Sequence, residues 1–301
     1  MHYNWTSQMS DLTFNIEQTY TMKKFFLLTY AALLMCACGP INEPVITSGD
    51  LKVSINRSLD FKIESTAAGS KEIFPDFAST DCIIADEATI STWKLKDWNE
   101  QKTSDGKRFN LHGTWEKDGY NIEKVLTIQV ADDFKNMIFI NSSYVNHSDK
   151  ILTVRALESN KVNFSVKDSL WSFQPASSCG DGDWVLPVEG GFYQKNVLDT
   201  NKYAATPMVT LWRKDANISI GLVEPEFKPV AIPVKRIRYR DHATMFVLQE
   251  FEEPILLQKG DTLNTYKQFI SIGKGDFSNP FGQYVKYMKE QIGRNLSEIT
   301  K

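Results

Sequence analysis

Two carboxylates and an indole lie close together in the stretch Cys179-Gly180-Asp181-Gly182-Asp183-Trp184. Such a loop could bind a sugar, because an indole stacks on the apolar face of a pyranose ring while carboxylates accept hydrogen bonds from its hydroxyl groups. Asp181, Asp183 and Trp184 are therefore candidate sugar-facing residues. The alternative interpretation is a surface loop in which Trp184 packs into the protein core.

Metal and nucleophile chemistry find little support in the sequence. Asp181 and Asp183 could offer oxygen ligands to calcium, but the stretch lacks the spacing of an EF-hand loop. No cysteine and histidine spacing matches a zinc site, and no G-x-S-x-G nucleophile motif is present. The four histidines are isolated from one another in the sequence: His2, His112, His147 and His242. We expect no metal, no cofactor and no hydrolase triad.

The other tryptophans and the charged residues are interpreted as structural. Trp93, Trp98, Trp115, Trp171 and Trp212 are expected to pack in the core or on sheet faces rather than to serve as sugar platforms. The formal net charge is −3 and the charged residues form no basic patch, which argues against nucleic acid as a partner.

The N-terminal segment resembles an export signal. Met22 is followed by Lys23 and Lys24, and residues 25–35 are almost wholly apolar over a length too short to span a bilayer. Small residues then precede Cys38, as in a bacterial lipobox. We predict that residues 1–21 precede the true start, that 22–37 are a lipoprotein signal peptide and that Cys38 carries lipid. An ordinary cleaved signal peptide and a retained membrane helix are the alternatives.

Beyond the predicted lipidation site, residues 38–49 are rich in glycine, proline and polar side chains, which predicts a tether. Cys82 and Cys179 are the remaining cysteines outside the signal. They could pair in an exported protein, but their separation alone does not decide whether they do.

Alternating apolar and polar residues predict many short strands. Clear examples are 51–55 and 59–63 around an Asn-Arg-Ser turn, and later 122–130, 137–145 and 266–272. The turn residues recur at short intervals, which is typical of antiparallel sandwiches. We predict an all-β fold, with one large antiparallel β-sandwich over residues 50–278.

One helix is predicted at the C-terminal end, over residues 279–293, followed by a tail, 294–301. Asn279 is a suitable N-cap, Pro280 suits the first turn and Gly293 suits a C-terminal stop. The helix should dock a stripe on the sandwich and leave Tyr287 exposed. The stripe consists of Phe281, Tyr284, Val285, Met288 and Ile292.

From Asp105 to Gly293 the chain resembles the N-terminal sandwich (supersandwich) domain of the family 36 glycoside hydrolases, the α-galactosidase-like enzymes. The likeness rests on the order and spacing of several segments rather than on any one of them. They are Asp105–Phe109, Tyr120–Lys124, Tyr144-Val145-Asn146, Asp183–Val188, Gly191–Asn196, Pro207–Arg213, Ile220–Glu224, Val230–Val234 and Gly275-Asp276-Phe277 with Pro280 and Tyr284.

The resemblance implies a galactose-mutarotase-like sandwich and a place in α-galactoside metabolism. In that family the sandwich continues into a (β/α)₈ barrel that carries the two catalytic carboxylates. The Lys-Gly-Asp runs at 259–261 and 274–276 are interpreted as turns rather than as a nucleophile motif. Tyr203 alone remains from the Asp-Tyr-Gly-Gly segment of the relatives, and it joins the candidate sugar-facing residues.

We therefore expect an exported cell-envelope lipoprotein, outer-membrane or periplasm-facing, that is a stand-alone or truncated sandwich of this family. It is expected to be non-catalytic by itself, with a galactoside or other glycan and a separate catalytic barrel as partners. Two alternatives stay open: a glycan-binding surface lipoprotein, and a structural or interaction lipoprotein without a sugar function. Fold alone does not choose among them.

Overall fold

The computed structural model describes residues 42–66, 77–79, 81–166, 169–174, 184–198, 207–226 and 228–299. The chain divides into two compact units, Met1–Asn42 and Glu43–Lys301, and the described residues beyond Asn42 belong to the second. Cys38, Cys179, Asp181, Asp183 and Tyr203 lie outside the described residues. Within the described part, no helix is long and apolar enough to cross a membrane.

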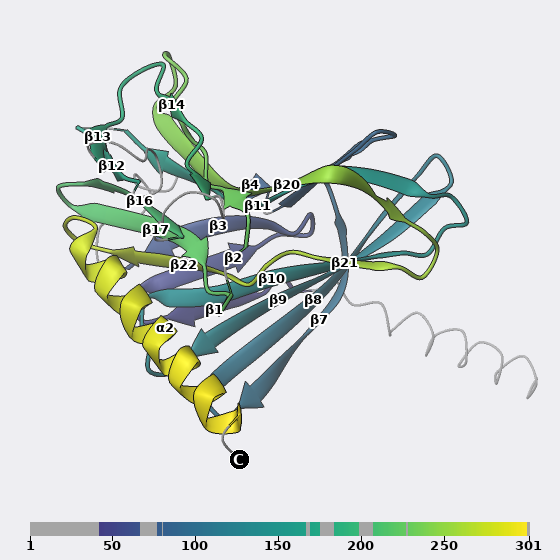
Figure 1. The fold of residues 1–301 in the computed structure, drawn as a ribbon, viewed down its shortest axis with the longest axis horizontal. Coiled ribbons are helices and arrows are strands. Elements are labelled where there is room, and N and C mark those ends of the chain that lie inside the picture. The colour runs from purple at the N-terminus through teal and green to yellow at the C-terminus, as the bar shows by residue number, and fades with distance from the viewer. Residues whose placement is uncertain are drawn as a thin grey trace, which may run out of the picture. The chain divides into compact units, whose positions relative to one another are not determined.

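The second unit is built from three antiparallel sheets (Figure 1). The smallest, with four strands, runs in the order β1 (Val45–Ser48), β2 (Leu51–Ile55), β3 (Asp60–Ser65) and β4 (Ala78–Ser79).

The ten-stranded sheet runs in the order β13 (Val185–Pro187), β12 (Trp171–Phe173), β16 (Met208–Arg213), β17 (Ala216–Leu222), β22 (Gln268–Gly273), β10 (Met137–Asn146), β9 (Tyr120–Ala131), β8 (Gly106–Lys117) and β7 (Lys94–Thr103), with β21 (Thr262–Asn264) also paired to β10.

The eight-stranded sheet runs β14 (Tyr193–Gln194), β19 (Val234–Lys235), β20 (His242–Leu257), β11 (Leu152–Ser165), β5 (Asp81–Ala85) and β6 (Thr89–Ile90), with β18 (Val230–Ala231) paired to β20 and β15 (Val197–Leu198) to β18.

Strict alternation along the long strands produces the sandwich core. In β9, Ile122, Leu126 and Ile128 are fully buried on the core face, whereas Glu123, Val125 and Thr127 face the other side of the sheet. Apolar side chains from all three sheets join the same buried cluster, which includes Val53 of β2, Leu126 of β9 and Val154 of β11. The all-β antiparallel sandwich predicted from the alternation is confirmed.

The β8–β9 hairpin shows how local sequence sets the register. Lys117 pairs with Tyr120, which leaves Asp118 and Gly119 as a two-residue turn. Both turn residues have positive φ, 51° and 82°, as a type I′ turn requires. An Asp-Gly pair adopts this conformation readily, so the register of two twelve-residue strands follows from it.

Helix α2 (Ser278–Ile299) lies along the ten-stranded sheet (Figure 1). Phe281, Val285 and Met288 pack against a second apolar cluster, as the predicted stripe requires, and Tyr284 is buried in it. The prediction for Tyr287 was wrong, because its side chain is only 5% exposed. The stripe is centred between Tyr284 and Tyr287, one helical turn apart, so both rings face the sheet.

Tyr287 is held by three specific contacts. Its ring stacks on Phe139 at 4.2 Å between centroids and meets the edge of Phe134 at 5.2 Å. Its hydroxyl accepts a hydrogen bond from Lys267 Nζ at 3.1 Å. These contacts fasten the helix to β10 and to the start of β22.

Two boundaries differ from the predicted ones. Helix α2 continues through Gly293 to Ile299, because a glycine ends a helix only where its backbone turns left-handed, and Gly293 has no positive φ. The predicted tether ends early, since Val45–Ser48 pairs with Leu51–Ser54 as a strand. Buried Ile46 anchors that strand to the core.

Candidate functional site

Trp184 is the one candidate sugar-facing residue that the structure describes. It directly precedes β13, and its carbonyl oxygen accepts a hydrogen bond from the backbone N–H of Gln174 at 2.8 Å. Its side chain is 53% exposed, so it does not pack into the core. The indole is thus available to a ligand, while its expected companions Asp181, Asp183 and Tyr203 lie outside the described residues.

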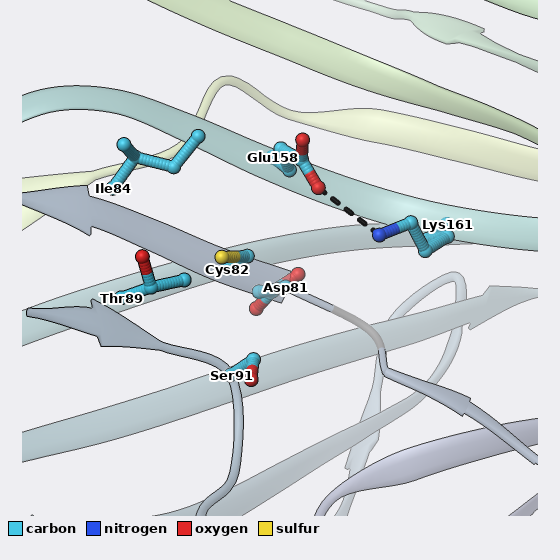
Figure 2. Close-up of a pocket in the computed structure, with 7 residues that line it drawn as sticks. All are labelled: Asp81, Cys82, Ile84, Thr89, Ser91, Glu158 and Lys161. Atoms are coloured by element: carbon cyan, nitrogen blue, oxygen red, sulfur yellow. Dashed lines mark hydrogen bonds and ion pairs between the residues drawn. The ribbon is translucent and has the colours of Figure 1, made fainter.

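A pocket of about 340 Å³ opens beside strands β5, β6 and β11 (Figure 2). Its lining consists of Asp81, Cys82, Ile84, Thr89, Ser91, Glu158 and Lys161. Figure 2 shows the ion pair between Glu158 and Lys161, which both lie on β11, and Lys161 Nζ is 3.1 Å from Glu158 Oε2.

The two carboxylates of this pocket do not form a catalytic pair. Glu158 lies directly opposite Cys82 in the β5–β11 register, so the two side chains share one face of the sheet. Asp81 is the neighbour of Cys82 and points to the opposite face, into the core. Glycoside hydrolysis needs two carboxylates that face one bond from either side, which this arrangement does not provide.

Cys82 is a buried free thiol. Burial raises its pKa to about 11, and the neighbouring Glu158 carboxylate adds to the rise. A thiol with so high a pKa stays protonated near neutral pH and is a poor nucleophile. Cys82 therefore does not supply covalent chemistry to this pocket.

On the core side, Asp81 is the centre of a buried polar network between the two large sheets. Its Oδ2 lies 2.7 Å from Lys124 Nζ on β9 and accepts hydrogen bonds from Ser142 Oγ at 2.6 Å and Tyr144 Oη at 2.9 Å on β10. Lys124 and Tyr144 are both 0% exposed. Burial raises the pKa of Tyr144 well above its usual range, and the Asp81 charge adds to it.

Trp93 completes this network. Its ring stacks on Tyr144 at 5.6 Å and lies under Lys124 Nζ at 5.5 Å. The cation is thus enclosed by a carboxylate and an indole, as a buried lysine requires. The network joins β5 of one sheet to β9 and β10 of the other, which is a structural role.

The Tyr144-Val145-Asn146 segment, part of the sequence resemblance, also has a structural role. The side-chain amide of Asn146 donates to the carbonyls of Lys150 and Leu257, each at 2.8 Å. The tyrosine joins the sheets and the asparagine closes the turn after β10. Neither side chain faces solvent.

The structure corrects the prediction that the histidines are isolated. His112 Nδ1 lies 3.2 Å from Glu123 Oε1, and His147 Nε2 lies 2.7 Å from Glu123 Oε2. Hydrogen bonds from His147 and then from His112 hold the pKa of Glu123 below its usual range. The side-chain alternation on adjacent strands β8 and β9 is the signal that could have revealed the His112–Glu123 contact.

The part of the chain with described coordinates contains no group of three or more histidine, cysteine, aspartate or glutamate residues suited to a metal ion. The cluster of His112, Glu123 and His147 is therefore an ion-pair and hydrogen-bond cluster on the surface of β8, β9 and the turn after β10. Its side chains are 30–47% exposed.

No family model and no curated protein matches this sequence. Solved structures do match its fold. An α-galactosidase AgaA variant from Geobacillus stearothermophilus, solved with stachyose, aligns with a TM-score of 0.60 at 12% identity over 82% of this chain and 42% of the enzyme.

Two further α-galactosidase structures agree. The Lactobacillus brevis enzyme gives a TM-score of 0.58 at 10% identity over 81% of this chain and 41% of its own. The galactosidase domain of the α-galactosidase–sucrose kinase AgaSK gives 0.54 at 9% identity over 76% and 40%. The chain thus spans about two fifths of the length of these enzymes, and its fold is that of their sandwich domain, as the sequence resemblance predicted.

Proposed function

We propose that this protein is a carbohydrate-associated sandwich that acts in α-galactoside metabolism and is non-catalytic by itself. The observation that carries the proposal is the fold match, which spans most of this chain but only about two fifths of each α-galactosidase. On this proposal, the catalytic carboxylates belong to a separate (β/α)₈ barrel with which the sandwich works.

The described turns support the non-catalytic part of the proposal. Asp261 accepts a hydrogen bond from the backbone N–H of Gln258, and Gly260 has a φ of 85°. Asp276 accepts from Ser278 N, and Gly275 has a φ of 78°. Both Lys-Gly-Asp runs therefore have the hydrogen bonds and backbone of turns.

We further propose that the protein is exported and held at the cell envelope by lipid on Cys38. The support is the sequence of residues 22–38, with its basic start, apolar core and small residues before the cysteine. A lipid-held sandwich would keep its glycan or barrel partner at the membrane surface.

Two measurements test the proposed function. The purified chain should not hydrolyse an aryl α-galactoside above the uncatalysed rate, although a real enzyme of this kind would exceed it by many orders of magnitude. Deletion of the gene in its source organism should slow growth on melibiose or raffinose and not on glucose. Equal growth on all three sugars would contradict the metabolic role, and turnover that disappears on replacing one carboxylate would contradict the lack of catalysis.

Glycan binding is the second candidate function, and the exposed indole of Trp184 favours it. A large aromatic side chain left half in water beside a strand end is typical of carbohydrate contact surfaces. This candidate is compatible with the first, because a sandwich that accompanies a hydrolase could also hold its substrate.

A further inference from the structure

We propose that a pocket between Trp171 and Trp212, at the edge of the ten-stranded sheet, binds a neutral oligosaccharide. This inference rests on the proposed carbohydrate function and assigns it a site. The pocket has a volume of about 620 Å³, which is within the usual range for small-molecule sites. Its lining consists of Ser169, Trp171, Trp212, Arg213, Lys214, Gly275 and Asp276.

The two tryptophans form the apolar part of the site. They are direct partners in the β12–β16 pairing, so their side chains project from the same face of the sheet. Trp171 is 38% exposed, and Trp212 is half-buried. The sequence analysis predicted that both tryptophans pack in the core or on sheet faces. Trp212 is only half-buried, and Trp171 is exposed, so packing does not explain the position of Trp171.

Aromatic contacts hold Trp212 in place. Its ring meets Phe277 at 5.7 Å, and Phe277 in turn stacks on Phe173 at 4.0 Å with an interplanar angle of 4°. This aromatic row joins β12 and β16 to the start of α2. The indole of Trp212 is therefore positioned before a ligand arrives, which lowers the entropy lost on binding.

The polar rim is also positioned in advance. The side-chain amide of Asn217, which is 0% exposed, lies within 3.0–3.2 Å of the carbonyl oxygens of Lys274, Gly275 and Asp276. One Asp276 carboxylate oxygen accepts from Ser278 N at 2.9 Å, which orients the carboxylate. Lys214 and Ser169 are exposed and add a cation and a hydroxyl.

This combination fits a pyranose better than a charged or wholly apolar ligand. Flat indoles match the apolar faces of sugar rings, and Asp276, Lys214 and Ser169 match hydroxyl groups as acceptor and donors. Arg213 does not offer its charge to the pocket, because its guanidinium is 2.7 Å from Asp215 and the residue is 3% exposed. With one cation and one carboxylate at the rim, the site has no net charge that would select an ionic ligand.

The test is a calorimetric titration of the purified chain with stachyose. Wild type should bind, and Trp171→Ala should weaken binding about tenfold, since it removes one stacking surface. Tyr239→Ala is the matched control, because Tyr239 is an exposed aromatic residue that does not line this pocket. Trp184→Ala is a separate variant that tests the alternative glycan contact at Trp184. Asp276→Asn keeps an acceptor for Ser278 N and should weaken binding by a smaller factor.

Several outcomes would overturn the site. They are no binding to wild type, equal binding by wild type and Trp171→Ala, or loss of binding in Trp184→Ala alone, which would place the glycan on the Trp184 loop. If Trp171→Ala binds stachyose as wild type does but no longer associates with a protein that has α-galactosidase activity, the pocket is a protein interface instead of a glycan site. The growth test of the proposed function is separate, so that function can survive the loss of this site.

Discussion

Residue types that are common in active sites do not by themselves define a functional site in this protein. Lys124, Asp81 and Tyr144 are the kinds of residue found in active sites, yet all lie in the core and satisfy one another. Their arrangement stabilises the contact between sheets. Burial of an ion pair costs desolvation energy, and removal of one partner leaves the other charge buried and unpaired. A single substitution in the pair therefore measures how strongly the fold depends on it.

Replacing Lys124 with methionine should lower the free energy of unfolding by about 3–5 kcal/mol, because the Asp81 carboxylate is left buried without its cation. Urea denaturation measures this loss. Lys52→Met is the matched control, because it removes a pair with Glu64 that is 39% and 15% exposed. That change should cost about 1 kcal/mol or less. Similar losses in the two variants would show that the buried pair has no special role.

Glu123 should make the stability depend on pH at the acid end. Its pKa in the folded protein is lowered from 4.5 by hydrogen bonds from His147 and His112. The ionised form is therefore favoured in the folded state, and its stabilising effect is present above pH 4.5 and lost as the pH falls through the lower folded pKa. Melting curves of wild type and Glu123→Gln between pH 7 and 3 should converge toward the acid end. A constant gap in melting temperature over that range would contradict this account.

At the scale of elements, the residue pattern of helix α2 predicted part of its packing but not all of it. The amphipathic stripe predicted docking, and the structure confirms it for Phe281, Tyr284, Val285 and Met288. The pattern did not set the rotation of the helix about its axis. The rings of Phe134 and Phe139 did, because the Tyr287 ring packs against both.

Tyr287→Ala should destabilise the protein by about 3 kcal/mol, the cost of removing a large aromatic from a packed cluster. Deletion of residues 279–301 should lower the melting temperature further. Tyr239→Ala is the control, because that ring is 90% exposed and its loss should change stability by less than about 0.5 kcal/mol. Thermal unfolding followed by circular dichroism measures all three. If the Tyr287 variant melts like wild type, the helix contributes little to the fold.

At the scale of the whole molecule, the sandwich has the fold of a domain found in several α-galactosidases. In the pocket beside β5, β6 and β11, Glu158 is paired with Lys161, whereas Ser169, Lys214 and Asp276 at the tryptophan-lined pocket are exposed. On the proposed function, the role of the protein depends on its anchoring at the membrane and on its glycan or barrel partner.

The lipid-anchor proposal predicts that Cys38→Ser moves the protein from the membrane to the soluble fraction. The physical reason is that acyl chains on Cys38 would supply the membrane contact, which the variant lacks. Immunoblots of fractionated cells measure the distribution, with Cys82→Ser as the control because that buried thiol is far from the signal in sequence. Unchanged membrane association of the Cys38 variant would rule the anchor out.

The sequence by itself determined the fold class, because alternation of apolar residues and turn chemistry such as Asp118-Gly119 act locally. It also determined that the stripe of Phe281, Tyr284, Val285 and Met288 docks, but not that Tyr287 docks beside it, since helical periodicity is a local property. Only the tertiary structure decided that Glu123 meets His147 as well as His112, that Lys124 is buried against Asp81, and that Trp171 and Trp212 share one pocket. Those contacts depend on strand order and on the pairing of segments that no short hairpin joins, which no local pattern specifies.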